Sequence, residues 1–145
     1  MKYPDRLPKR NNAYDGQKAH NDNRYYTVGR IAYNSWAADV LPVADIVVYE
    51  SELIHIANRH GKELETIGMD VFDFVNFIME NYNAVYQGTG NSYLLVVLRE
   101  NVSDMAAIEL HTEVVNGEEV YRINTAAPIK TKLLYSKTLL CANDR

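Results

Sequence analysis

The stretch AAIELHTEVVNGEEVYRINTAA, which runs from Ala106 to Ala127, decides the fold because it reads as one long β-hairpin. Asn116-Gly117 is the strongest short hairpin signal, since both residues tolerate the positive φ angles of a two-residue turn. With this turn, Leu110 faces Ile123 across the hairpin. Side chains alternate along a strand, so the register predicts one mainly apolar face and one polar face.

The same register assigns the remaining side chains of the hairpin. Ile108 is expected to face Thr125 on the apolar side, which places Thr125 at the end of its strand and toward the helices. The polar side carries Glu109, His111, Glu113, Arg122 and Asn124. Two interpretations stay open for this side: a solvated sheet face with weak cross-strand pairs, or a concave surface that binds a ligand.

The segment before the hairpin has the pattern of a strand followed by two helices. ADIVVYE (residues 44–50) reads as a strand, and Ser51 reads as the N-cap of a helix with apolar residues at helical spacing. Gly61 either ends this helix or weakens it in the middle. Asp70 is a candidate N-cap for a second helix, whose apolar stripe extends from Val71 to Tyr82.

Three more strands are expected. NAVYQ and SYLLVVLR flank the glycine-rich turn GTGN, and IKTKLLYSKTLL reads as a final strand. The sequence therefore predicts an α+β fold, with two N-terminal helices packed on a mostly antiparallel sheet of four to five strands. Residues 44–145 form this single domain, and residues 1–43 form a polar N-terminal arm with short irregular elements. Within this arm, TVGRIAY (residues 27–33) could be a short strand, and SWAADVL (residues 35–41) could be a helical turn that Pro42 stops.

Composition narrows the class of protein. With 145 residues, of which 47% are hydrophobic, the chain has the size of one domain with a real core. Cys141 is the only cysteine, which excludes an intramolecular disulfide and paired-cysteine zinc sites and fits a cytoplasmic protein. No apolar run reaches the roughly 18 residues of a membrane span, so we expect no membrane partner. The net charge of -4 argues against a surface that is basic all over, but it allows a small basic cleft.

A pair of histidines raises the question of function. SELIHIANRHGKELE places His55 and His60 on either side of the Arg59 side chain. The two histidines are separated by about 140° around a helix axis, so they do not share a face. His60 falls in line with the apolar residues, at the rim of the core, and His55 is expected to be exposed. Because the i, i+4 spacing of a helical metal site is absent, we expect neither a metal nor another cofactor.

The order of these elements resembles a known family. IVVYESELIHIANRHGKELETIG, an apolar helix, NAVYQG, a hairpin and YRINTAAPI are similar to the phage-associated nuclease-like domains grouped with barnase, EndoU, colicin-type toxins and RelE (the BECR fold). The likeness covers about residues 44 to 140, and its motif is a helix that reads roughly H-I-x-x-R-H. It implies a metal-independent endoribonuclease of toxin or phage type. RNA, with tRNA as one candidate, would be the substrate, and an immunity or antitoxin protein a partner.

The resemblance implies a role for each matching residue. His55 and His60 would transfer the two protons of RNA cleavage through a 2',3'-cyclic phosphate, because the pKa of imidazole, about 6.5, suits both steps. Arg59 would stabilise charge on the phosphate. Thr125 would be the catalytic hydroxyl of the late strand. Our own inference adds further basic side chains that would bind phosphates: Arg122, Lys130 and Lys132.

Two other functions remain open. A non-catalytic phage accessory or protein-binding module with a degenerate nuclease-like fold would use the polar hairpin face and the tyrosine-rich surface. The acidic net charge favours this alternative. A transferase that acts on a nucleotide is the third option, and it is weaker because the glycine-rich GTGN precedes a strand rather than a helix.

Overall fold

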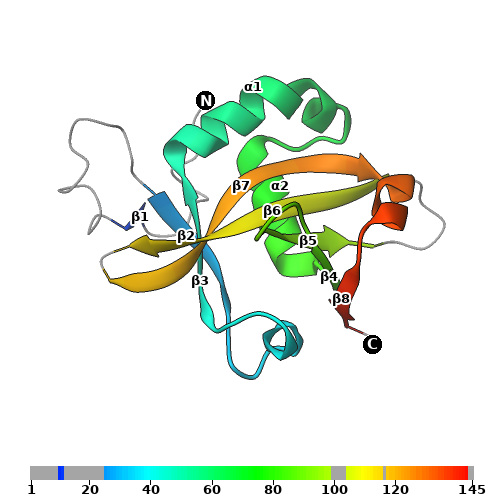
Figure 1. The fold of residues 1–145 in the computed structure, drawn as a ribbon. Coiled ribbons are helices and arrows are strands. Elements are labelled where there is room, and N and C mark those ends of the chain that lie inside the picture. Colours follow the sequence, from blue (N-terminus) through cyan, green and yellow to red (C-terminus); the bar gives the residue numbers. More distant parts are fainter. Residues whose placement is uncertain (1–9, 12–24, 99–103, 116, 144–145) are drawn as a thin grey trace.

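A mixed sheet of eight strands carries the fold, in the order β1-β2-β3-β7-β6-β5-β4-β8 (Figure 1). The computed structural model describes residues 10–11, 25–98, 104–115 and 117–143. The strands are β1 (Arg10–Asn11), β2 (Tyr25–Ile31), β3 (Ala44–Tyr49), β4 (Ala84–Gln87), β5 (Tyr93–Val97), β6 (Asp104–Val115), β7 (Glu118–Lys130) and β8 (Leu139–Ala142). The helices are α1 (Glu50–Thr66) and α2 (Val71–Asn81), with two short 3₁₀-helices, η2 (Trp36–Asp39) and η3 (Thr131–Ser136). Within these ranges, no helix has the length and apolar character needed to cross a membrane.

The two helices start in different ways. Asp70 caps α2 as expected, and it forms a capping box with Asp73, which satisfies backbone N–H groups at the helix start. The N-cap of α1 is Tyr49 instead of Ser51, and no side chain caps it. Gly61 does not end α1, because the helix continues to Thr66.

The expectation of two N-terminal helices on a mostly antiparallel sheet of four to five strands is wrong. Strands β1, β2 and β3 all precede α1, the sheet has eight strands, and β3 pairs with β7 in parallel. The short strand and the helical turn expected within the N-terminal segment are present as β2 and η2. Ile31, Ala37 and Leu41 from this segment are buried in the main core, so it is part of the folded sheet and core. The expected arm residues 1–9 and 12–24 lie outside the described residues.

The predicted final strand also divides in the structure. Ile129 and Lys130 belong to the end of β7, the next six residues form η3, and only Leu139 to Ala142 form β8, which pairs with β4. The segment therefore supplies the end of one strand, a short 3₁₀-helix and the start of another strand. Lys, Thr and Ser interrupt its apolar residues, so its pattern does not define one continuous strand.

The core lies on both faces of the sheet. The main cluster packs between the sheet and the helices and includes Ile56, Phe74, Ile108 and Ile123. Alternate residues of the same strands point to the opposite face. There they form two smaller clusters, one with Tyr49 and one with Ala107.

Strand β3 pairs with β7 only near Tyr121 and Arg122, and α1 lies beside β7 farther along. The parallel ladder joins Ile46 to Tyr121 and Val47 to Arg122. The chain then turns into α1, which contacts β7, and Figure 1 shows α1 alongside the continuing β7. The helix therefore borders the side of β7 that a neighbouring strand would otherwise occupy.

The hairpin has the predicted register near its turn and a different one farther away. Leu110 faces Ile123 as expected, but a β-bulge follows, so that Glu109 faces Thr125 and Ile108 faces Ala126. The expected pairing of Thr125 with Ile108 is therefore wrong. One extra residue in β7 moves Thr125 to the face that carries Glu109.

Candidate functional site

A groove of about 670 Å³ lies between α1 and the β6–β7 hairpin. We call it the α1–β7 groove. It is lined by Ser51, Glu52, His55, Arg59, His60, Glu109, Asn124, Thr125 and Ala127. The structure thus brings together both histidines, the arginine between them and the late-strand threonine from elements far apart in the sequence.

The two histidines reach one groove even though they lie on different sides of the helix. Ile56 is fully buried, and His60 lies near the same side of the helix and is only partly exposed. His55 and Arg59 are exposed. The groove therefore borders about half of the circumference of α1. A helix that lies beside a strand, rather than flat on a sheet, presents this much of its surface to the gap.

His60 is held in place by a neighbour on its own helix. Its Nδ1 lies 2.6 Å from Oε1 of Glu63, one turn farther along. When Nδ1 carries the proton, it donates to Glu63, and Nε2 is left for a ligand. Glu63 therefore orients the His60 ring.

Glu109 is a groove residue to which the sequence analysis gave no catalytic role. Its carboxylate accepts hydrogen bonds from Ser92 Oγ at 3.2 Å and from Asn124 Nδ2 at 3.1 Å. His111 Nε2 lies 3.5 Å from its Oε1. The signal was its place on the polar face of the hairpin, but only the bulge sets Glu109 opposite Thr125.

Arg122 does not line the groove, and its guanidinium is already paired. Nη1 donates to Glu113 at 3.0 Å, and Nη2 donates to Glu52 at 3.2 Å. The group also lies 4.2 Å from the centre of the Tyr49 ring, and the Tyr49 hydroxyl donates to Glu113. Burial alone would lower the pKa of Arg122, but the hydrogen bond and charge of Glu113, with the charge of Glu52, raise it overall. Arg122 therefore ties the first turn of α1 to the sheet.

Of the two lysines predicted to bind phosphates, Lys132 is not among the residues that line the groove. Lys130 is the last residue of β7, and its side chain lies outside the described ones. Lys132 is exposed on η3, and it lines neither the α1–β7 groove nor the second hollow that is described below. Lys137, which the sequence analysis did not select, lies at a second hollow.

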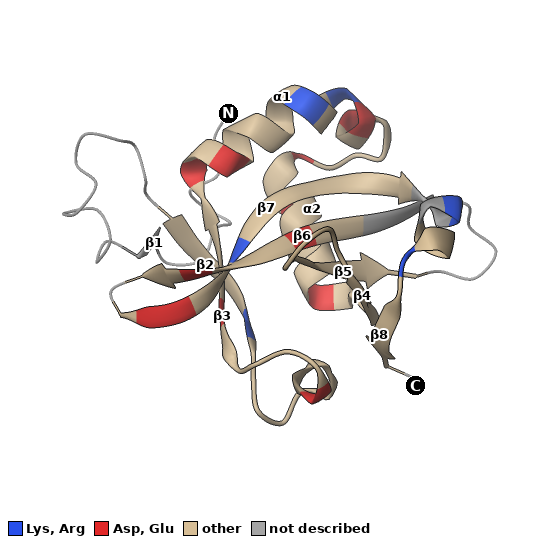
Figure 2. Ribbon diagram, viewed as in Figure 1, with Lys and Arg blue, Asp and Glu red and all other residues tan. Residues whose placement is uncertain are grey.

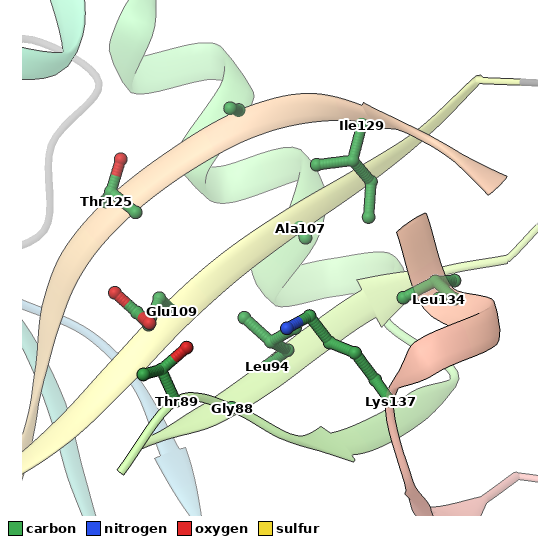
Figure 3. A pocket seen from close by; sticks show the side chains of 10 residues that line it. Gly88, Thr89, Leu94, Ala107, Glu109, Thr125, Ile129, Leu134 and Lys137 are labelled. Atoms are coloured by element: carbon green, nitrogen blue, oxygen red, sulfur yellow. The ribbon is translucent and has the colours of Figure 1, made fainter. Parts of the chain in front are cut away.

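The second hollow adjoins the groove and is mainly apolar (Figure 3). Its volume is about 200 Å³. The lining residues are Gly88, Thr89, Leu94, Ala107, Glu109, Thr125, Ala127, Ile129, Leu134 and Lys137. In Figure 3 the Lys137 side chain extends across the hollow toward Leu94, while Glu109 and Thr125 lie toward one end. We call this space the apolar hollow.

Charge varies along α1. The first turn is acidic, with Glu50 and Glu52, basic residues follow near the middle, and Glu63 and Glu65 lie near the end of the helix (Figure 2). Among the groove residues that the structure describes, Arg59 is the one Lys or Arg side chain, facing the carboxylates of Glu52 and Glu109. Protonation of either histidine therefore makes the groove more positive.

Across residues 10–11, 25–98, 104–115 and 117–143, no group of three or more His, Cys, Asp and Glu side chains is arranged to hold a metal ion.

Comparisons with known proteins identify no relative of this chain. No protein-family model matches the chain, and no curated protein or solved structure matches it either. The geometry of the groove and of the adjoining hollow is therefore what carries any functional conclusion.

Proposed function

We propose that the α1–β7 groove cleaves RNA without a metal, by transfer of the phosphate to the neighbouring 2'-hydroxyl. The observation that carries this proposal is that His55, Arg59 and His60 line the same groove as the hydroxyl of Thr125. Two imidazoles, a cation and a hydroxyl are the groups that such a reaction requires. They come from a helix and a strand, which hold them more rigidly than loops would.

The reaction needs only proton transfer and charge stabilisation. A base removes the proton of the 2'-hydroxyl, the 2'-oxygen attacks phosphorus, and the bond from phosphorus to the 5'-oxygen breaks. The leaving oxygen takes a proton from an acid, so the products are a 2',3'-cyclic phosphate and a 5'-hydroxyl. His55 and His60 carry these two protons, and Arg59 and Thr125 bind the phosphate. Glu109 is a further proton acceptor on the opposite wall of the groove.

A second function has its own support. Because Arg122 is paired with Glu113 and Glu52, Arg59 is left to neutralise phosphate in a groove that also contains two carboxylates. RNA affinity depends strongly on such neutralisation. A protein-binding module with a nuclease-like arrangement, and no catalytic activity, would have this balance of charges.

Cleavage assays with three variants distinguish the two functions. Total tRNA and a generic RNA are incubated with wild type, His55→Ala, His60→Ala and Asn58→Ala in the presence of EDTA. Asn58 is exposed on α1 and does not line the groove, so its variant controls for changes to the helix. We expect each histidine variant to lower the cleavage rate by about 100-fold or more, since positioned acids and bases contribute this much. Asn58→Ala should cleave like wild type.

The products and the pH profile complete the test. Cleavage should leave 2',3'-cyclic phosphate ends and show a bell-shaped rate against pH, because one imidazole acts neutral and the other protonated. Wild type that leaves both RNAs intact would contradict catalysis and favour the binding module. Histidine variants that cleave as fast as wild type would contradict catalysis in this groove.

A further inference from the structure

The apolar hollow and the α1–β7 groove are two halves of one surface. Glu109, Thr125 and Ala127 line both of them. Successive residues on this face of β7 lead from the groove into the hollow, through Thr125 and Ala127 to Ile129. A ligand that begins in the groove therefore reaches the hollow past these three shared residues.

The two halves differ sharply in chemistry. The groove carries His55, Arg59 and His60, whereas the walls of the hollow are mainly apolar and include Leu94 and Ile129. Apolar walls in contact with a charged groove favour a ligand with an anionic part joined to a flat, weakly polar part. A nucleotide has this division between its phosphate and its base.

The size of the hollow fits a ring system. An apolar cavity of about 150 Å³ accepts one benzene molecule. The hollow, at about 200 Å³, has room for more than one six-membered ring. This favours the fused rings of a purine over a single pyrimidine ring.

Polar groups are present where the edge of a base would need them. The Lys137 ammonium donates hydrogen bonds and extends over the hollow, and the Glu109 carboxylate accepts them at the other end (Figure 3). Asn124 and His111 both approach Oε1 of Glu109, whereas among the described residues only Ser92 bonds Oε2, so Oε2 keeps a lone pair as an acceptor. A purine carries both donors and acceptors on its edges.

We propose that the apolar hollow binds the purine base of a nucleotide whose phosphate lies in the α1–β7 groove. This inference rests on the proposed function for its phosphate, and it adds a preference among substrates. Leu94 and Ile129 contact the faces of the base, Lys137 donates to a ring nitrogen or carbonyl oxygen, and Glu109 accepts from an amino or ring N–H group.

Binding measurements test the hollow separately from cleavage. Isothermal titration measures the affinity of wild type for adenosine, guanosine, cytidine and uridine 3'-monophosphates and for ribose 5-phosphate, which has no base. We expect the better purine nucleotide to bind at least about tenfold more tightly than ribose 5-phosphate and more tightly than both pyrimidine nucleotides. Equal affinities for nucleotides and ribose 5-phosphate would overturn the proposal.

Two variants locate the binding of the base. Ala107 lines the hollow but not the groove, so Ala107→Leu fills the hollow and should remove most of the advantage over ribose 5-phosphate. Lys137→Met should reduce the advantage severalfold, whereas Lys62→Met, which removes an exposed lysine from α1, should not. If Ala107→Leu fails to fold in urea titration, the Lys137 and Lys62 pair still decides the question. Unchanged purine binding in Lys137→Met would contradict the proposed hydrogen bond from Lys137 to the base.

The outcomes for this site and for the proposed function are distinct. Purine nucleotides that bind through the hollow, together with RNA that stays intact, would retain the base site and reject catalysis. RNA cleavage with no base preference and no effect of the Ala107 variant would retain catalysis and reject the base site.

Discussion

At the scale of single residues, Arg122 shows how a charged side chain on an open sheet face is used within the protein. Its two Nη groups reach carboxylates from different elements, Glu52 in α1 and Glu113 in β6, and its plane lies over the Tyr49 ring. The side chain is 31% exposed, so these pairs are shielded in part from solvent. Partial burial makes such pairs costly to break, because the carboxylates left behind have no cation.

Removal of Arg122 should therefore lower stability. We expect Arg122→Met to reduce the free energy of unfolding by about 1–3 kcal/mol, since two carboxylates lose their partner in a partly desolvated place. The matched control is Arg30→Met, because Arg30 pairs with Asp45 at 2.8 Å but is 55% exposed. That change should cost less than about 1 kcal/mol. Urea unfolding of both variants measures the difference, and equal losses would show that Arg122 has no special structural role.

The sequence indicated several residues that line the groove, but it did not indicate which side chains interact with one another. The H-I-x-x-R-H pattern selected His55, Arg59 and His60, and the structure places all three at one groove. Pattern alone could not show that Arg122 is paired, because its partner Glu52 lies on another element. It could not select Lys137 either, since its position depends on the turn of chain through η3.

At the scale of elements, the two helices differ in how their N-termini are capped. Asp70 accepts a hydrogen bond from the Asp73 backbone N–H at 2.8 Å, so the start of α2 is satisfied by a side chain. Ser51 was expected to do the same for α1 but lies inside its first turn. The buried strand β3 leads directly into α1, so tertiary structure sets the start of that helix instead of a cap.

The two capping candidates give opposite expectations. Asp70→Ala should lower the free energy of unfolding by about 1 kcal/mol, the usual loss of an N-cap. Ser51→Ala should change it by less than about 0.5 kcal/mol, as expected of an exposed position without a capping bond. Thermal and urea unfolding of the two variants, measured side by side, provide the comparison. A larger loss for Ser51→Ala would mean that α1 depends on the serine.

The bulge in β7 marks the limit of register reasoning. The Asn116-Gly117 signal fixed the pairs near the turn, from Val115 with Glu118 to Leu110 with Ile123. Nothing in the alternation of the sequence predicted the extra residue beyond Ile123. The apolar Ala126 and the polar Thr125 fit either register, because alanine and threonine are tolerated on both faces of a sheet.

At the scale of the whole molecule, Tyr121 joins distant parts of the chain. It is 1% exposed, and its hydroxyl donates to the Pro42 carbonyl at 2.7 Å, just before β3. Burial, together with the charges of Tyr93 and Glu119, raises the pKa of Tyr121 from 10.0 to about 12. The folded protein therefore keeps this proton at a pH at which the unfolded chain has lost it.

The raised pKa predicts how stability changes in alkali. Tyr121 contributes its full stability below pH 10.0, and this contribution falls as pH rises toward about 12, because the unfolded state releases the proton first. We expect Tyr121→Phe to weaken the fall in stability over this range. Burial also raises the pKa of Tyr82, so part of the fall should remain in this variant. Tyr135→Phe, at an exposed site, is the control. Urea midpoints measured from pH 8 to 12 that coincide in shape for Tyr121→Phe and wild type would refute this linkage.

The sequence could predict the local elements of the molecule better than their assembly. The helices and the hairpin come from contiguous patterns, and their types were recognised. The pairing of β3 with β7, by contrast, joins residues 46 and 47 to residues 121 and 122. No local pattern encodes such a partner, so neither the eight-stranded sheet nor the place of β2 within it could be derived.

This central pairing also constrains the order of events on the ribosome. Translation adds about 5–20 residues per second, so β3 and α1 wait several seconds before β7 has been made. During that interval the backbone of Ile46 and Val47 has no partner from β7, so this edge of β3 lacks its parallel ladder. Contacts between segments so far apart form slowly, which leaves the partly synthesised chain open to chaperones until β7 has been made.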